Sequence, residues 1–251
     1  MQLLHSATRN YSWGSRTLIP HLQGQPDADK PVAELWFGAH PGDPSTVDDR
    51  LLNEVIAEDP AGQLGSRVSA EYGERLPFLL KVLAAEEPLS LQAHPSKAQA
   101  EEGFARENAA GIELTASNRN YKDDNHKPEL IVALTDFYAM AGFRPLARTR
   151  ELFAALECPE LDHYVAMLDD DPSATTESAN LRVLFTTWIT IPSAKRKELI
   201  SAIVAAGERL IAADPADWKS RVMSTVLDLN QRYPGDIGVP VSYTHLTLPT
   251  T

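Results

Sequence analysis

The chain has 251 residues, of which 43% are hydrophobic and 23% are charged, a balance typical of a globular protein. Its net charge of −12 disfavours nucleic acid and anionic membranes as partners, although a few local cations can still hold an anionic substrate. The single cysteine excludes an internal disulfide framework and any multi-cysteine zinc site. No apolar stretch resembles a secretion signal or approaches the roughly 20 residues of a membrane helix, so we expect a cytoplasmic protein.

Up to about residue 145 the sequence is interrupted every few residues by Gly, Pro, Asn or Asp, which predicts mostly β-structure. The side chains at residues 32–38 alternate in the way expected of a strand, and this strand would carry Glu34. Two stretches, 48–61 and 66–72, are candidates for short helices.

A continuous apolar run at residues 76–83 predicts a further strand, interrupted by Lys81. A buried lysine is costly without a partner. Lys81 therefore either reaches the edge of the sheet or faces a polar cavity.

Residues 88–95 also resemble a strand, in which Ser90, Gln92 and His94 would share one face. Directly after it, Ser96 and Gln99 have the spacing of a capping box, which predicts the start of a short helix.

Another strand is predicted at residues 125–134. If this segment is extended, Lys127 and Glu129 share a face and His126 lies on the other. We therefore interpret His126 as a residue that does not bind metal, and we interpret His40 and His163 in the same way.

From about residue 149 to residue 233 the hydrophobic pattern becomes helical. Asp214 and Pro215 suit an N-cap followed by proline at the first helical position. Two sets of apolar residues recur at helix spacing: Leu199, Ile203, Ala206 and Leu210, and Trp218, Val222, Val226 and Leu229. The Met and aromatic residues of this block are interpreted as core rather than as cofactor contacts.

The last stretch, residues 241–251, matches neither the helical block nor the segments before it. It resembles a peptide encoded by one reading frame of a common sequencing adapter, so we expect the natural protein to be cut off near Pro240 in this chain. The alternative is a natural C-terminal strand, which its β-propensity would permit.

Gln92, His94 and Glu129 together offer an amide oxygen, an imidazole nitrogen and a carboxylate oxygen. Three ligands with an open position fit a catalytic metal better than a structural one. Each residue alone is better explained as an ordinary polar or solvated side chain, and only the two segments taken together favour a metal site.

Five blocks of the sequence, in order and spacing, resemble the type I phosphomannose isomerase family. They are residues 10–14 (Asn-Tyr-Ser-Trp-Gly), 33–41 (Ala-Glu-Leu-Trp-Phe-Gly-Ala-His-Pro), 77–83 (Pro-Phe-Leu-Leu-Lys-Val-Leu), 89–95 (Leu-Ser-Leu-Gln-Ala-His-Pro) and 121–129 (Tyr-Lys-Asp-Asp-Asn-His-Lys-Pro-Glu). The resemblance extends from Met1 to about Pro240.

The resemblance implies a mainly β fold with α-helices: an incomplete cupin-type jelly roll with an inserted helical domain. The expected domains are residues 1–145 as the first part of the catalytic cupin, 146–235 as the helical domain, and 236–251 as a returning cupin segment whose residues 241–251 are artefactual. The implied activity is the interconversion of mannose 6-phosphate and fructose 6-phosphate through an enediol, within carbohydrate metabolism and GDP-mannose biosynthesis.

The resemblance also implies one Zn²⁺ per chain, held by Gln92, His94 and Glu129. The family's fourth ligand, a histidine, and a catalytic arginine lie in strands that these 251 residues do not contain, and His245 stands outside their sequence context. We therefore expect this chain to bind zinc weakly, to have little or no activity, and to expose apolar strand surface that promotes aggregation. The complete protein is expected to be a monomer whose partner is a small sugar phosphate.

Further residues match the lining of the family's pocket. Lys127 would add positive charge near the developing enediolate and is the candidate catalytic residue, whereas the candidate substrate-binding residues are Trp13, Glu34, Lys81 and Ser90. Each also has an ordinary explanation, as a turn aromatic, an edge carboxylate, a strand lysine, a strand serine or a loop cation.

Two other classes of function stay open on the sequence. A non-catalytic cupin module that binds a sugar phosphate in regulation would lack the histidine and the arginine of the missing strands. A cupin metal oxygenase is disfavoured because such sites commonly use two or three histidines, whereas this set offers one.

Overall fold

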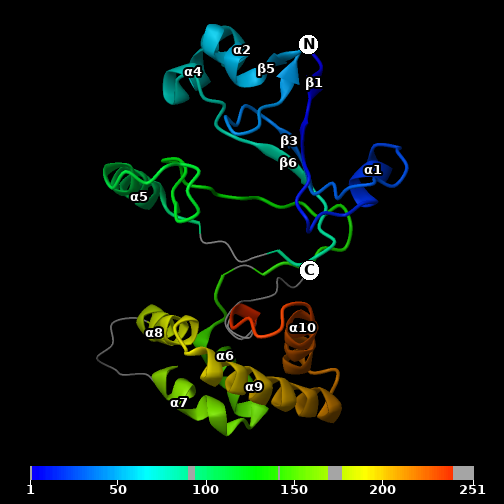
Figure 1. The fold of residues 1–251 in the computed structure, drawn as a ribbon, viewed down its shortest axis with the longest axis vertical. Coiled ribbons are helices and arrows are strands. Elements are labelled where there is room, and N and C mark those ends of the chain that lie inside the picture. Colours follow the sequence, from blue (N-terminus) through cyan, green and yellow to red (C-terminus); the bar gives the residue numbers. More distant parts are fainter. Residues whose placement is uncertain (1, 90–93, 141, 169–176, 240–251) are drawn as a thin grey trace. The chain divides into compact units, whose positions relative to one another are not determined.

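The computed structural model describes residues 2–89, 94–140, 142–168 and 177–239, with only the backbone described at 177–179. The chain divides into two compact units, Met1–Pro128 and Glu129–Thr251. All the named strands belong to the first unit (Figure 1). Within the described ranges, every helix is too short or too polar to cross a membrane.

In its described part, the first unit contains two antiparallel, three-stranded sheets. One has the order β1 (Leu4–His5), β4 (Thr46–Val47) and β5 (Arg50–Leu51), and the other has the order β2 (Ala7–Arg9), β3 (Glu34–Phe37) and β6 (Leu80–Leu83). A small apolar cluster of Ile19, Leu35 and Ala84, with Val82 against it, covers one face of the second sheet. This leaves the opposite face for polar side chains.

The described residues of the first unit also form five helices: α1 (Leu18–Leu22), α2 (Leu52–Glu58), α3 (Pro60–Leu64), α4 (Ser66–Tyr72) and α5 (Lys97–Ala109). Helix α4 coincides with the predicted helix at 66–72. The capping box that begins α5 is confirmed, because the Ser96 side chain accepts from the Gln99 amide and the Gln99 side chain accepts from the Ser96 amide.

The helix predicted at 48–61 is wrong in its start and its continuity, although most of the segment is helical as α2 and the beginning of α3. Asp48 and Asp49 both have positive φ and form the two-residue turn between β4 and β5, as type I′ hairpins require. The helix that follows ends at Glu58, because Asp59 precedes Pro60 and is not helical, and Pro60 begins α3.

The strand predictions are corrected in three places. The strand at 32–38 is found as β3, but the one at 76–83 is limited to Leu80–Leu83. Residues 88, 89, 94 and 95 of the predicted 88–95 strand have no strand structure, and its residues 90–93 lie outside the described ranges. The segment 125–134 forms no strand either, since a strand needs a hydrogen-bonded neighbour and the described sheets offer it none.

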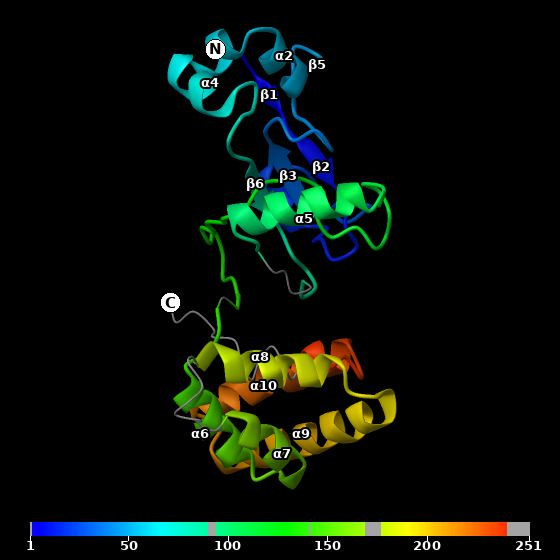
Figure 2. The same ribbon diagram turned by 90° about the vertical axis from the view of Figure 1, so that its left-hand side faces the viewer.

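The second unit is helical. Its elements are α6 (Leu146–Leu156), a 3₁₀ turn at Pro159–Leu161, α7 (Asp162–Val165), a 3₁₀ turn at Ala166–Leu168, α8 (Glu177–Ile189), α9 (Ser193–Ala213) and α10 (Trp218–Arg232). Figure 2 shows α9 and α10 beside one another, and a Cβ on Gly207 of α9 would lie 2.6 Å from Met223 Cε of α10. Trp188 and Met223 are fully buried, which confirms that they belong to the core.

Helix α10 begins three residues later than its sequence predicts. Asp217 is the N-cap and its side chain accepts from the Lys219 amide at 2.9 Å, whereas the Asp214 carboxylate accepts from the Ala216 amide in the preceding turn. Both aspartates are chemically suited to capping a helix. Asp214 uses its carboxylate within the turn before the helix, so Asp217 becomes the N-cap.

One apolar segment of the second unit is largely exposed: Leu130, Ile131, Val132 and Leu134 are 60–90% exposed. Because exposed, extended apolar segments recruit other chains, we expect Ile131→Lys to reduce self-association. Light scattering over a concentration series measures this, with Gln231→Lys as a control that adds the same charge at an exposed polar position. A wild-type chain that stays monomeric at high concentration would contradict the expectation.

Candidate functional site

The register of the β2–β3–β6 sheet brings charged and aromatic side chains to one face. Arg9 pairs with Glu34, and Trp36 pairs with Lys81. Because residues two apart on a strand share a face, all four point to the same side. Leu35 points to the opposite side, into the apolar cluster.

Glu34 is the buried centre of this face, with 6% of its surface exposed. Its Oε2 accepts from the Trp36 indole N–H at 2.8 Å, and its Oε1 lies 3.7 Å from Lys81 Nζ. A buried carboxylate is costly unless it is hydrogen-bonded and paired. Trp36 and Lys81 meet that requirement for Glu34. In turn, Glu34 is the partner that a lysine in this strand needs.

Lys81 is held on a second side by the Trp36 ring, whose centroid is 4.7 Å from Nζ. A cation over an indole face is attracted by the ring quadrupole. About a third of the Lys81 side chain stays exposed. The ammonium is therefore oriented by Glu34 and Trp36 and is still accessible to an anion.

An aromatic row continues from this face to Trp13. The Arg9 guanidinium lies 5.1 Å from the ring centroids of both Trp36 and Tyr11, and it forms an ion pair with Asp43 at 2.6 Å. The Tyr11 and Trp13 rings are stacked with centroids 5.4 Å apart. Trp13 is half-buried at the end of the row, so the structure connects it to the Glu34 face through ring contacts.

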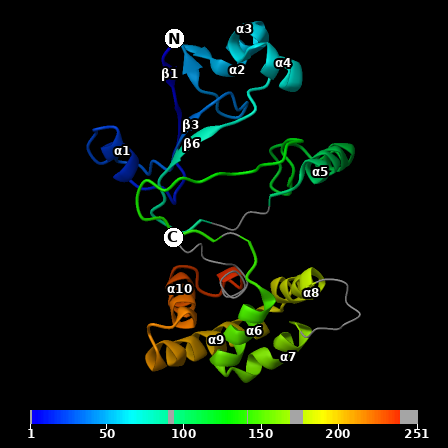
Figure 3. The same ribbon diagram turned by 180° about the vertical axis from the view of Figure 1, so that it is seen from behind.

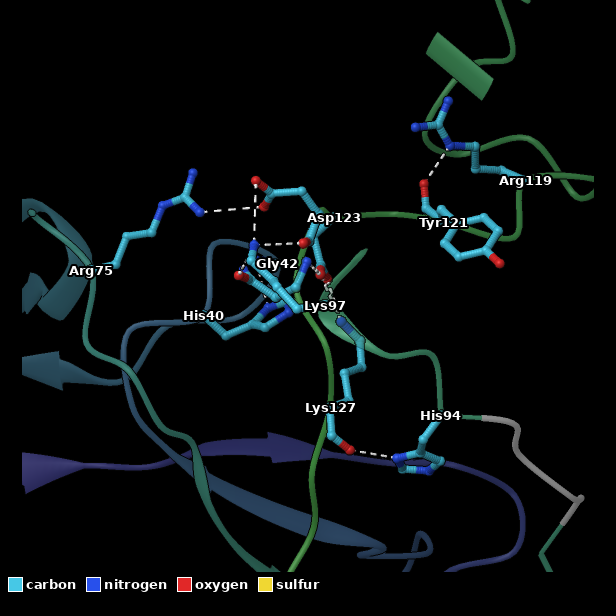
Figure 4. Close-up of polar contacts among 11 residues, drawn as sticks. His40, Gly42, Arg75, His94, Lys97, Arg119, Tyr121, Asp123 and Lys127 are labelled. Carbon is cyan, nitrogen blue, oxygen red and sulfur yellow. Dashed lines mark hydrogen bonds and ion pairs between the residues drawn. The ribbon is translucent and has the colours of Figure 1, made fainter. Parts of the chain in front are cut away.

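A second polar group includes His40, Asp123 and Lys127 (Figure 4). Asp123 accepts from Lys127 Nζ at 2.6 and 2.7 Å. The His40 ring packs edge-on against Trp36, with centroids 5.2 Å apart, and its Nδ1 accepts from the Gly42 amide. Burial lowers the pKa of His40, and the charge of Lys127 acts in the same direction while Asp123 opposes it. The lowered pKa favours the neutral form of the His40 ring.

His94 is joined to Lys127 by a hydrogen bond across 33 residues of sequence. Its Nδ1 donates to the Lys127 carbonyl, as Figure 4 shows. A protonated Nδ1 leaves the lone pair on Nε2. Histidines that bind metals typically use their second ring nitrogen in this way, because the hydrogen bond fixes the tautomer and the ring orientation.

The structure brings Glu34 and Lys81 together and places Lys127 beside His94. Ser90 and Gln92 lie outside the described residues. Glu129 is the exposed first residue of the second unit. The described ranges contain no group of three His, Cys, Asp or Glu residues arranged to hold a metal.

Three site residues were missed by sequence reasoning: Arg9, Trp36 and Asp123. Trp36 stands two positions after Glu34 in the same strand, so alternation could have placed both on one face. Asp123 stands four positions before Lys127, but only the irregular loop geometry brings their charges together. Arg9 could be placed beside Glu34 only from the register of β2 against β3, which the sequence alone does not reveal.

The hydrogen bond from the Trp36 indole N–H to Glu34 can be tested by mutation. We expect Trp36→Phe to lower the free energy of unfolding by about 1–3 kcal/mol, because it leaves a buried carboxylate oxygen of Glu34 without its donor. Urea denaturation measures the change. Trp13→Phe deletes the same atoms from a half-buried ring and should cost less, and equal losses in the two variants would contradict the assignment.

A comparison with known proteins places this site in a family. The family model described as "Phosphomannose isomerase type I, catalytic domain" matches residues 1–146. The mannose-6-phosphate isomerase of Escherichia coli K12 is 37% identical over 247 residues, which are 95% of this chain and 59% of that protein. The human mannose-6-phosphate isomerase is 33% identical and is covered to 57% of its length.

Solved structures of mannose 6-phosphate isomerases also resemble this chain. Mannose 6-phosphate isomerase from Salmonella typhimurium bound to fructose 6-phosphate and zinc superposes with a TM-score of 0.82 and 34% identity, over 100% of this chain and 61% of that one. A holo, zinc-bound mannose 6-phosphate isomerase superposes with a TM-score of 0.83. The likeness confirms the expected fold class, although the described sheets do not close into a barrel.

This chain thus spans about three fifths of the length of the curated relatives it matches. The family model covers more than half of the chain, and the similarity to the Escherichia coli relative extends over nearly all of it. The chain therefore belongs to the type I phosphomannose isomerase family.

Proposed function

We propose that this chain forms the metal and sugar-phosphate site of an isomerase that interconverts mannose 6-phosphate and fructose 6-phosphate. The observation that carries the proposal is the hydrogen bond from His94 Nδ1 to the Lys127 carbonyl. It joins the candidate metal ligand to the candidate catalytic residue, in a family with a member whose structure holds fructose 6-phosphate and zinc.

The donor set fits a zinc ion with an open position. Gln92, His94 and Glu129 would hold it through an amide oxygen, the imidazole Nε2 and a carboxylate oxygen. The protonated Nδ1 of His94 is the feature of this structure that supports the fit. When bound, the metal supplies polarisation of the sugar's oxygens.

Lys127 is the proposed catalytic residue of the chain. Aldose–ketose isomerisation moves a proton between C1 and C2 through an enediol, and negative charge develops on the adjacent oxygens. The Lys127 ammonium stabilises that charge, and its ion pair with Asp123 holds it in a fixed position. Asp123 is therefore assigned to orienting Lys127.

Lys81 and Ser90 are proposed to bind the phosphate. The chain is strongly acidic overall, so a dianionic substrate needs a local positive charge. Lys81 provides one that is about one third exposed and is held by Glu34 and Trp36. Trp13 is proposed to line the part of the pocket that holds the sugar. Glu34 is proposed to orient Lys81, because its Oε1 lies 3.7 Å from Lys81 Nζ.

We also propose that the functional boundary lies at residues 145 and 146, with the helical domain extending to residue 235. Two observations support this: the family match ends at residue 146, and α6 begins at Leu146.

Metal binding can be tested on the 251-residue chain itself. We expect His94→Ala to abolish Co²⁺ binding, because it removes the nitrogen ligand, whereas His126→Ala should leave it unchanged. Co²⁺ serves as the probe because it takes zinc sites and its absorption spectrum reports on the ligands. Equal Co²⁺ affinity in the His94→Ala variant and the wild type would contradict the metal site.

Catalysis can be tested in a chimera that continues residues 1–239 of this chain with the part of the Escherichia coli relative that the chain does not match. We expect Lys127→Met to lower kcat by roughly 10²–10³-fold, since it removes charge stabilisation of the transition state. Lys122→Met is the matched control, because Lys122 is an exposed lysine of the same segment. Similar kcat values for the two variants would contradict the role of Lys127.

A further inference from the structure

The segment that follows α5 folds back along the helix, as Figure 3 shows. Its contacts run in the reverse order of the sequence: residues 119–121 contact Glu107, Tyr121 contacts Gly103, and residues 124–125 contact Lys97. From Glu107 to Lys97 the helix rises about 15 Å. The segment is thus attached at three positions along most of α5.

The first attachment is a buried ion pair between Glu107 and Arg119. Arg119 Nε lies 3.1 Å from Glu107 Oε2, and the two side chains are 0% and 7% exposed. Arg119 also donates to the carbonyls of Tyr121 and Ile112, and Glu107 accepts from the amides of Asn120 and Tyr121. The Tyr121 amide is the largest influence that lowers the pKa of Glu107, so the pair is charged at neutral pH.

The backbone at Asn120 and Tyr121 supplies several partners of this ion pair, and the Asn108 and Asn120 side chains and the Ile112 carbonyl supply the others. A buried ion pair contributes little net stability, but its fixed geometry can specify one conformation. The conformation specified here is that of residues 119–121.

The second attachment depends on a glycine in the middle of α5. A Cβ on Gly103 would lie 2.5 Å from the Tyr121 ring, so the ring packs where any other residue would place its side chain. Glycine is unfavourable in the middle of a helix compared with alanine. The close approach of Tyr121 is the physical reason for a glycine at this position.

The third attachment lies at the start of the helix. Lys97 Nζ donates to the Asp124 carbonyl at 2.8 Å and to Asn125 Oδ1 at 3.3 Å. Two residues further on, the Lys127 carbonyl accepts from His94, which stands three residues before Lys97. Both partners of the His94 hydrogen bond are therefore tied to the same end of α5.

We propose that α5 acts as a splint that places the Lys127 carbonyl so that it orients His94, with Gly103, Glu107 and Arg119 as positioning residues. The inference rests on the proposed metal site, because it assigns a purpose to the orientation of His94. None of the three residues needs to touch the metal or the sugar. They act through the backbone of the segment at residues 119–127.

The test compares Gly103→Ala and Glu107→Gln with Glu102→Gln in the full 251-residue chain. Glu102 is an exposed residue of the same helix, 79% exposed in its side chain, and controls for the loss of a carboxylate. The first measurement is ¹⁵N NMR of the His94 ring without metal. We expect one tautomer, protonated at Nδ1, in the wild type and in Glu102→Gln, and a mixture of tautomers in the other two variants.

The second measurement is the affinity for Co²⁺. We expect Gly103→Ala and Glu107→Gln to weaken it by roughly tenfold or more, as the loss of a residue that orients a ligand typically does. Gly103→Ala is informative because its methyl group displaces the Tyr121 ring, whereas alanine supports the helical conformation of α5 itself. Should Glu107→Gln fail to fold, Lys97→Met cuts the third attachment at the exposed end of the helix.

Folded variants that keep the single Nδ1-protonated tautomer and the wild-type Co²⁺ affinity would overturn the splint. The failure of the proposed metal site gives a different result. In that case His94→Ala binds Co²⁺ as tightly as the wild type, while the tautomer measurement still decides whether α5 orients the His94 ring.

Discussion

The candidate site depends on one hydrogen bond, from His94 Nδ1 to the Lys127 carbonyl. It joins a residue in front of α5 to a loop after α5, and it decides which imidazole nitrogen keeps its lone pair. The capping box at Ser96 fixes where the helix starts, directly after His94. The loop is fixed by the residues of α5 that bind it. The orientation of the His94 ring therefore depends both on the local capping box of α5 and on the contacts between α5 and the loop that follows it.

The second constraint is electrostatic. The proposed function requires that an acidic chain keep a cation accessible to a sugar phosphate without letting its many carboxylates neutralise the site. Glu34 meets this condition because it is buried and its Oε2 accepts from the Trp36 indole. Lys81 then lies between a carboxylate and an aromatic ring, with part of its surface open. The same carboxylate that lowers the cost of a strand lysine also fixes where its charge lies.

Sequence patterns were sufficient where the structure is local. The capping box at Ser96, the strand around Glu34 and the apolar spacing of Ile203 and Val226 all appear as predicted, because each depends on residues within a few turns or one strand. The strand at residues 125–134 was wrong because strand formation depends on a partner that no local pattern reveals. The Glu107–Arg119 pair was missed for a related reason, since only the return of the loop along α5 brings these two residues together.

Whether His94 presents Nε2 to a metal can be seen in a crystal structure of the chain grown with zinc and measured at the zinc absorption edge. We expect an anomalous peak about 2.0–2.1 Å from His94 Nε2, with Nδ1 still bonded to the Lys127 carbonyl. A peak on Nδ1, or zinc bound only at another histidine such as His40 or His163, would contradict it.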